Sequence, residues 1–167
     1  MNGKKLLILG AGQYGQLVRE TALAIGSFAK VAFLDDGNPV ALGKLEAYSN
    51  FVREYSCAFV AIGNPTVRRF WLDRLEQAGF ELPVLVHPKA WVSPSAQLAP
   101  GVIVEPMAVA NAGAKVGRGC LLCAGSVVNH NAIVEDCCQI DCNAVVAANA
   151  CVPEGTKVKS CTVFEKI

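Results

Sequence analysis

The chain has 167 residues, of which 53% are hydrophobic and 17% charged, so it can bury a sizeable core and is not expected to be disordered. Its formal net charge of +1 gives no electrostatic reason to expect nucleic acid or an anionic membrane as a partner. No apolar run reaches the roughly 18 residues that a membrane span needs. The apolar start resembles a weak signal peptide, but glycines interrupt it at once, so we expect a cytoplasmic protein without membrane insertion.

The first part of the chain alternates between strand and helix patterns. A buried strand over residues 5–9 is followed by the glycine-rich turn GAGQYG and a helix over residues 16–25. The segments KVAFLDD and CAFVAIG predict two further parallel strands, and a second helix follows the last one. This βαβ order predicts a Rossmann-like α/β domain over residues 1–82.

The glycine turn has the context of a nucleotide-binding loop. It follows a strand and opens a helix, and two acids stand about 20 residues further on, where a Rossmann unit places its ribose ligand. Glycines let backbone N–H groups approach a pyrophosphate at a helix N-terminus. A tight turn without a ligand is the structural alternative. The residues expected to bind a nucleotide sugar are Gly10, Gly12, Gln13, Tyr14, Gly15, Asp35, Asp36, Gly63, Asn64 and Arg68.

The short length of this domain bears on the ligand. About 80 residues are too few for two mononucleotide-binding halves, which disfavours a full NAD-binding domain. A ligand with one nucleoside and a diphosphate fits better, and a UDP-sugar or similar nucleotide sugar is the partner expected here.

The second part of the chain, residues 83–167, repeats with a period of six. Neither a helix nor a simple strand sustains such a period, and hexapeptide repetition is typical of a parallel β-helix solenoid. We expect the aliphatic residue of each hexad to point into the prism and the small residue four positions later to turn the corner. The aliphatic series is Val86, Val92, Leu98, Val104, Ala110, Val116, Leu122, Val128, Val134, Ile140, Val146, Val152 and Val158.

The eight cysteines invite a disulfide or metal interpretation. Cys120 and Cys138 occupy the small positions of the repeat, and four zinc ligands at standard spacings are not evident. We therefore expect small, reduced cysteines and no metal site. One of the two histidines, His87, stands beside Pro88 where the solenoid begins and is expected to be structural.

The combination resembles the nucleotide-sugar acetyltransferases of the sialic acid O-acetyltransferase and bacillosamine N-acetyltransferase family. The segments that carry the resemblance are LGAGQYG, FLDD, AIGNPTVRR, LVHPKAWVSPSAQL and VVNHNAIVEDCCQI. The resemblance implies a left-handed β-helix assembled as a homotrimer, with the acceptor's nucleotide held by the first domain. It also implies acetyl-CoA as co-substrate, in a groove between neighbouring solenoids, and no metal.

The same resemblance assigns roles in the solenoid. It implies that His130 is the general base, in a position outside the prism that core packing does not require. Asn131 stands where the family usually has an acid, and Gln139 where a second histidine is common; we expect both to contribute hydrogen bonds. Asn143 replaces a turn glycine, and Ala148 leaves room beside the ring for a thioester. Gln139, Asn143 and Ala148 are the residues expected to bind acetyl-CoA.

Three functions remain open at this stage. The first is an acetyl-CoA-dependent acyltransferase that acts on an amine or hydroxyl of a nucleotide-linked sugar. The second is a non-catalytic nucleotide-sugar-binding protein that has lost acetyl-CoA binding through its short solenoid. The third is a NAD-dependent enzyme or sensor. His130 also has a plainer interpretation, as a turn residue without a role.

Overall fold

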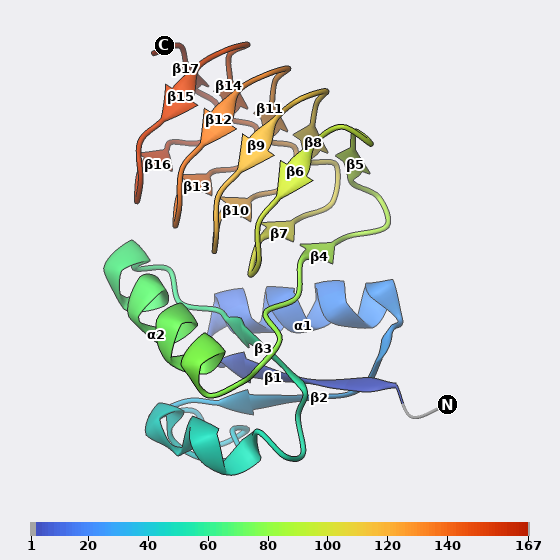
Figure 1. The fold of residues 1–167 in the computed structure, drawn as a ribbon, viewed down its shortest axis with the longest axis vertical. Coiled ribbons are helices and arrows are strands. Elements are labelled where there is room, and N and C mark those ends of the chain that lie inside the picture. Colours follow the sequence, from blue (N-terminus) through green and yellow to red (C-terminus); the bar gives the residue numbers. More distant parts are fainter. Residues whose placement is uncertain (1–2, 167) are drawn as a thin grey trace. The chain divides into compact units, whose positions relative to one another are not determined.

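The computed structural model describes residues 3–166 and divides into two compact units after Pro83, one residue later than the sequence analysis placed the boundary. Figure 1 shows an α/β unit at the N-terminal end of the chain and a stack of short strands at the C-terminal end. Each unit is described separately.

The first unit is built on a three-stranded parallel sheet in the order β2-β1-β3. Residues 6–9 of the central strand are fully buried, as expected for a parallel strand covered on both faces. Edge-to-face packing of Tyr48 on Trp71, with ring centroids 5.7 Å apart, joins η1 to α2. The elements are β1 (Lys4–Leu9), α1 (Gln13–Ile25), β2 (Phe28–Leu34), the 3-10 helix η1 (Leu45–Phe51), β3 (Cys57–Val60) and α2 (Pro65–Gln77).

Two boundaries in this unit differ from the expectation. Helix α1 begins at Gln13 instead of residue 16, because Gly15 is a helical residue that packs under the preceding turn and does not interrupt the helix. The 3-10 helix η1 was not predicted. Its half-buried residues Leu45, Tyr48 and Phe51 recur every three positions, which is the spacing that would have indicated it.

The second unit is a left-handed β-helix of two-residue strands stacked into three parallel sheets (Figure 1). Face 1 contains β4 (Leu85–Val86), β7 (Ile103–Val104), β10 (Leu121–Leu122), β13 (Gln139–Ile140) and β16 (Lys157–Val158). Face 2 contains β5 (Trp91–Val92), β8 (Val109–Ala110), β11 (Val127–Val128), β14 (Val145–Val146) and β17 (Val163–Phe164). Face 3 contains β6 (Gln97–Leu98), β9 (Lys115–Val116), β12 (Ile133–Val134) and β15 (Cys151–Val152).

The period of six fills the prism with side chains, as predicted. From Val104 to Val158 every residue of the aliphatic series is at most 4% exposed. The small series also points inward, since each of its members from Val102 to Ala150 is fully buried. Two inward side chains per hexad, one aliphatic and mostly one small, therefore make the core of this unit.

The position of the corners differs from the expectation that the small residue of each hexad makes the turn. From Gly101 onward the chain turns at the residue before each small residue, because that residue has a positive φ and the small one does not. Left-handed backbone favours glycine and tolerates asparagine, which explains many of the residues found there. The eleven corner positions are Gly101, Met107, Gly113, Gly119, Gly125, Asn131, Cys137, Asn143, Asn149, Gly155 and Cys161.

Outward acids bind corner amides of neighbouring rungs. Glu105 accepts a hydrogen bond through Oε2 from the Ala124 N–H at 2.9 Å, and Glu135 accepts one in the same way from the Glu154 N–H, also at 2.9 Å. Asp136 Oδ1 accepts from the Arg118 N–H. These carboxyl groups satisfy backbone donors that the sheets leave unpaired, so the three acids have a structural role in the solenoid.

Candidate active site

The glycine turn between β1 and α1 contains two glycines that the fold itself requires. Gly10 has φ 103°, and a Cβ there would lie 2.6 Å from the Ala61 carbonyl oxygen. A Cβ on Gly15 would collide with the Gly10 carbonyl oxygen. Both residues let the backbones of β1, α1 and the loop after β3 approach one another, so their presence does not by itself indicate a ligand.

Gly12 and Gly63 are different, because packing does not require either of them. Each has an ordinary φ, and a Cβ added to either would meet nothing within 4 Å. Gly12 is the N-cap of α1, and the exposed Gln13 and half-buried Tyr14 open the helix. Open space beside a helix N-terminus is where backbone N–H groups can receive a phosphate.

The two acids after β2 have separate environments. Asp35 is half-buried, and its carboxylate accepts from the N–H groups of Ala11 at 2.8 Å, Gly37 at 2.9 Å and Asn38 at 2.8 Å. The hydrogen bond from Ala11, followed by that from Gly37, lowers the pKa of Asp35. Asp35 thus ties the glycine turn to the β2 loop. Asp36 is exposed and accepts from the Leu45 N–H through Oδ1, so it is the better placed of the two for a ribose.

The loop after β3 is held from both ends. Asn64 caps α2 by accepting from the Val67 N–H. Arg68 is only 1% exposed, and its Nη1 donates to the carbonyl oxygens of Ile62 and Gly63, both at 2.9 Å. Burial and these two bonds place the Arg68 guanidinium against the backbone of the loop, where it supports Ile62 and Gly63, and its expected part in nucleotide-sugar binding stays a prediction.

His130 lies at the corner between faces 2 and 3, where β11 leads into β12. It is exposed, and its backbone is fixed on both sides: its N–H donates to Asn129 Oδ1 at 2.8 Å, and its carbonyl oxygen accepts from the Asn149 N–H at 3.2 Å. Ala112 and Ala148 take the same place on the rungs before and after it. The ring therefore stands on a rigid corner with only methyl groups stacked above and below.

Asn131 has a structural role that the sequence analysis did not assign. It is a corner residue with φ 56°, and its side-chain oxygen lies over Gly113 of the preceding rung, where any Cβ would collide with it. Asn143 repeats this arrangement over Gly125. Both asparagines are accounted for by the left-handed turn, and a catalytic contribution from Asn131 stays a prediction.

The residues expected to bind acetyl-CoA are divided within one chain. Ala148 lies beside His130, but Asn143 lies at the corner between faces 1 and 2, on the opposite edge of face 2. Gln139 is on face 1, where its Nε2 lies 3.9 Å from Cys123 Sγ. A single solenoid therefore does not bring Gln139 and Asn143 to His130.

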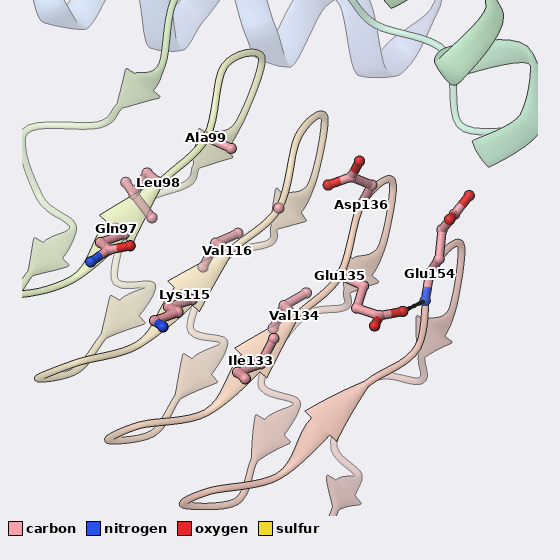
Figure 2. A pocket seen from close by; sticks show the side chains of 11 residues that line it. Gln97, Leu98, Ala99, Lys115, Val116, Ile133, Val134, Glu135, Asp136 and Glu154 are labelled. Atoms are coloured by element: carbon pink, nitrogen blue, oxygen red, sulfur yellow. Dashed lines mark hydrogen bonds between the residues drawn. The ribbon is translucent and has the colours of Figure 1, made fainter.

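A hollow of about 630 Å³ on the outer surface of face 3 was not predicted from the sequence (Figure 2). At the corner between faces 3 and 1 its lining contains three acids, and Lys115 is the one cation among its lining residues. Figure 2 shows Glu135 accepting its hydrogen bond from the Glu154 backbone at this end. The acids disfavour the anionic end of a CoA molecule there. The lining residues are Gln97, Leu98, Ala99, Lys115, Val116, Gly117, Ile133, Val134, Glu135, Asp136 and Glu154.

Face 2 carries an apolar ladder, defined by its outward residues Trp91, Val109, Val127, Val145 and Val163. Trp91 is 59% exposed and Val163 58%, while the three valines between them are half-buried. A continuous row of apolar side chains on the surface is typical of a surface that another protein covers. His130 lies at the edge of this ladder.

The cysteines and the remaining histidine have local explanations. Cys120 and Cys138 point inward and donate to the carbonyl oxygens of Glu135 and Pro153. The neighbouring Cys138 thiol, together with burial, raises the pKa of Cys120. His87 accepts from the Lys89 N–H through Nδ1. Among residues 3–166, no three metal-ligating side chains come together and no helix is long and apolar enough to cross a membrane.

Comparison with known proteins gives matches over both units. The family model of the PglD N-terminal domain matches residues 5–75. The acetyltransferase domain of PglB from Neisseria gonorrhoeae is 30% identical with a TM-score of 0.93, and the match covers 98% of this chain and 83% of that one. The same domain in complex with acetyl coenzyme A is 29% identical, with a TM-score of 0.92 and the same coverage.

A more distant match shows the fold alone. A histidine-to-alanine mutant of the GDP-perosamine N-acetyltransferase from Caulobacter crescentus, in complex with CoA and GDP-perosamine, is 23% identical with a TM-score of 0.73. The match covers 95% of this chain and 90% of that one.

Proposed function

The chain belongs to the hexapeptide-repeat nucleotide-sugar acetyltransferases, and on that premise we propose that it moves the acetyl group of acetyl-CoA to an amine of a nucleotide-linked sugar, with His130 as the base. The observation that carries the proposal is His130 itself, exposed on a rigid corner between rungs that present only methyl groups. An amine is favoured over a hydroxyl because the Caulobacter protein with this fold is an N-acetyltransferase.

The chemistry needs one proton acceptor at this corner. The sugar amine attacks the thioester carbonyl carbon, and His130 takes the proton that the nitrogen loses. The intermediate then expels the CoA sulfur, and the imidazolium returns the proton to it. The products are an N-acetyl sugar and the free thiol of CoA.

The first unit is proposed to hold the nucleotide end of the acceptor. Gly12 leaves space at the N-terminus of α1 for a diphosphate, and Asp36 is exposed beside it for the ribose. Asp35, Asn64 and Arg68 support this site by fixing the loops around it. Ligands of parallel sheets bind at the carboxyl ends of the strands, where all these residues stand.

A homotrimer with parallel solenoids is proposed as the working assembly. The apolar ladder of face 2 supports it, because these side chains are exposed to water in a single chain. Assembly is also the way to bring Gln139 and Asn143 of one subunit to His130 of another.

Val145→Asp on the ladder should reduce the mass measured by light scattering to that of a monomer. Ile133→Asp, which changes an exposed branched residue on face 3, should leave the trimer intact.

The test of catalysis is the release of CoA thiol from acetyl-CoA with UDP- or GDP-linked amino sugars, followed by mass spectrometry of the sugar. His130→Ala should lower kcat by about two to four orders of magnitude, as the loss of a general base does. Its thermal stability and its affinity for UDP should not change. Glu154→Ala, at the same place in a hexad at another corner, is the matched control and should keep full activity. A parent protein that binds the nucleotide sugar without releasing thiol would instead be a non-catalytic binding protein.

A further inference from the structure

A hollow of about 400 Å³ lies on the first unit, at the end of the sheet where its strands begin. Strand β1 starts there at Lys4 and reaches the glycine turn after Leu9, so the hollow is at the other end of the sheet from the proposed nucleotide site. Its volume is in the range of small-molecule sites, which is about 300–1,000 Å³. The lining residues are Gly3, Lys4, Lys5, Ala29, Val52, Arg53, Glu54 and Ser56.

An irregularity in the sheet puts two lysines side by side at this hollow. The register of β1 against β2 shifts between Lys4 and Lys5, so Ala29 is skipped and Lys5 lies opposite Lys30. Like charges directly opposite each other on neighbouring strands are destabilising. Both Nζ atoms approach the same carboxylate oxygen, Glu54 Oε1, at 3.6 Å for Lys5 and 3.0 Å for Lys30. One carboxylate therefore stands between two ammonium groups and leaves one positive charge in excess.

Two more cations line the hollow. Lys4 is paired with Glu81, whose Oε2 lies 2.6 Å from the lysine Nζ. Arg53 is exposed and has no ion pair among the described residues. Around the hollow, Lys4, Lys5, Lys30 and Arg53 thus outnumber the carboxylates Glu54 and Glu81, whereas the whole chain has 15 cations and 14 acids. The excess of positive charge is local, and a concave surface with this lining favours an anion.

We propose that this hollow binds the phosphate group of a small molecule, held by Lys5, Arg53 and the Ser56 hydroxyl. A phosphate monoester carries a charge of about −1.5 to −2 at pH 7 and has three strong acceptor oxygens. Arginine matches two of these oxygens with paired N–H groups, and lysine adds a point charge. A small molecule is favoured over a lipid surface, because no lining residue is a large exposed hydrophobic one that could enter a membrane. The proposal does not depend on acetyl transfer.

The first test is a titration with inorganic phosphate, followed by the backbone amide signals of isotope-labelled protein in NMR. Sodium chloride keeps the ionic strength constant, so general screening of charges contributes no change. We expect saturable shifts at Gly3, Ala29 and Ser56. These shifts should persist in Gly12→Ala, because the glycine turn is a separate phosphate site. Shifts confined to the glycine turn, or shifts near the hollow that do not saturate, would overturn the inference and leave the proposed function untouched.

Two substitutions should change the affinity for phosphate in opposite directions. Arg53→Gln removes a cation, so the dissociation constant should rise about five- to tenfold. Glu54→Gln removes the negative charge that competes for Lys5 and Lys30, so the dissociation constant should fall by a similar factor. Arg19→Gln changes an exposed cation on α1 outside the hollow and should bind phosphate like the parent. Thermal unfolding shows that each variant is folded. Unchanged affinity in both Arg53→Gln and Glu54→Gln would contradict the proposal.

Three probes identify the source of the phosphate group. Glycerol phosphate should bind at least as tightly as inorganic phosphate, and glycerol should not bind. Vesicles of phosphatidylglycerol should not sediment the protein at physiological ionic strength. If the vesicles do sediment the parent but not Arg53→Gln, and glycerol phosphate leaves the amide signals unchanged, the hollow is a surface for lipid headgroups and the inference of a small ligand is wrong.

Discussion

The two units of this protein place their functional residues by different means. In the first unit each candidate residue has contacts of its own: Asp35 binds the glycine turn, and Arg68 supports the loop after β3. In the solenoid a residue's surroundings follow from its place in the hexad, so His130 and Asn129 are outward whatever their side chains are. In the first unit the candidate residues therefore also hold the fold together, whereas in the second a candidate residue can be replaced without changing the fold. Substitutions can test this difference.

The largest effect is expected from a methyl group in the glycine turn. Gly15→Ala would place a Cβ against the Gly10 carbonyl oxygen, and backbone atoms on both sides cannot move away. We expect the first unit to lose more than about 4 kcal/mol of stability, the range of a severe core defect. Gly12→Ala, which meets open space, should unfold like the parent but bind UDP less tightly. Fluorescence of the buried Trp71 follows the unfolding, and Trp91→Phe removes the second tryptophan. Equal stability of the two alanine variants would contradict the packing argument.

In the solenoid the loss of stability caused by a substitution should depend on its position in the hexad. Leu122→Ala empties an inward place that is fully buried, which typically costs about 2–5 kcal/mol. Ile133→Ala truncates an outward side chain that is 41% exposed, so it should cost much less. Urea unfolding followed by circular dichroism compares the two. Similar losses would mean that the outer surface of face 3 is also part of the core.

The corners should respond in opposite directions to glycine and alanine. Met107 is 68% exposed and has φ 64°, a backbone conformation that costs a residue with a Cβ about 1–2 kcal/mol. Met107→Gly should relieve that strain, partly offset by the greater freedom of an unfolded glycine, for a gain below about 1 kcal/mol. Gly113→Ala adds the same strain and a collision with Asn131, so it should lower the melting temperature. If the melting temperature rose in both variants, backbone strain at the corners could not be the cause of the change.

The smallest effects concern the pH dependence of stability. As the pH falls, one carboxylate in the first unit should lower stability and one in the solenoid should raise it. Hydrogen bonds from Ala11 and Gly37 lower the pKa of Asp35, so its contribution to stability is present above about pH 4 and is lost as the pH falls further. Burial raises the pKa of Glu105, so folding favours its protonated form, and the solenoid gains stability as the pH falls through that raised value. Melting curves between pH 7 and pH 3 should show both trends. Asp35→Asn and Glu105→Gln should each flatten one of them.

The sequence predicted the solenoid more completely than the first unit. A strict period of six allows few structures, and β17 at Val163–Phe164 continues it to the end of the described chain. The corner residue was placed one position late, because small side chains alone do not reveal which residue has a positive φ. Short-range patterns likewise indicated the strands of the first unit but missed η1.

The site was predictable only as far as single residues reveal their surroundings. The role of His130 as a base comes from resemblance and stays a prediction, and the exposure of the residue agrees with a position outside the core. The burial of Arg68 could not be foreseen, because arginine in the first turn of a helix usually faces water. The hydrogen bond between the side chains of Asn111 and Asn129 joins residues 18 positions apart, which becomes visible only when three hexads are known to make one turn.

Because three hexads make one turn of the solenoid, the length of an insertion or deletion decides whether later residues stay on their face. Duplicating 18 residues adds one full turn and moves later residues along the axis by about 4.8 Å, the spacing of hydrogen-bonded strands, without changing their face. Deleting six residues before His130 instead rotates everything after them by one face. The histidine would then stand at the corner between faces 1 and 2, on the opposite edge of the ladder begun by Trp91 and Val109. Such solenoids are therefore free to lengthen by whole turns, whereas a shift of one hexad moves the proposed catalytic residue to another corner while every rung still packs.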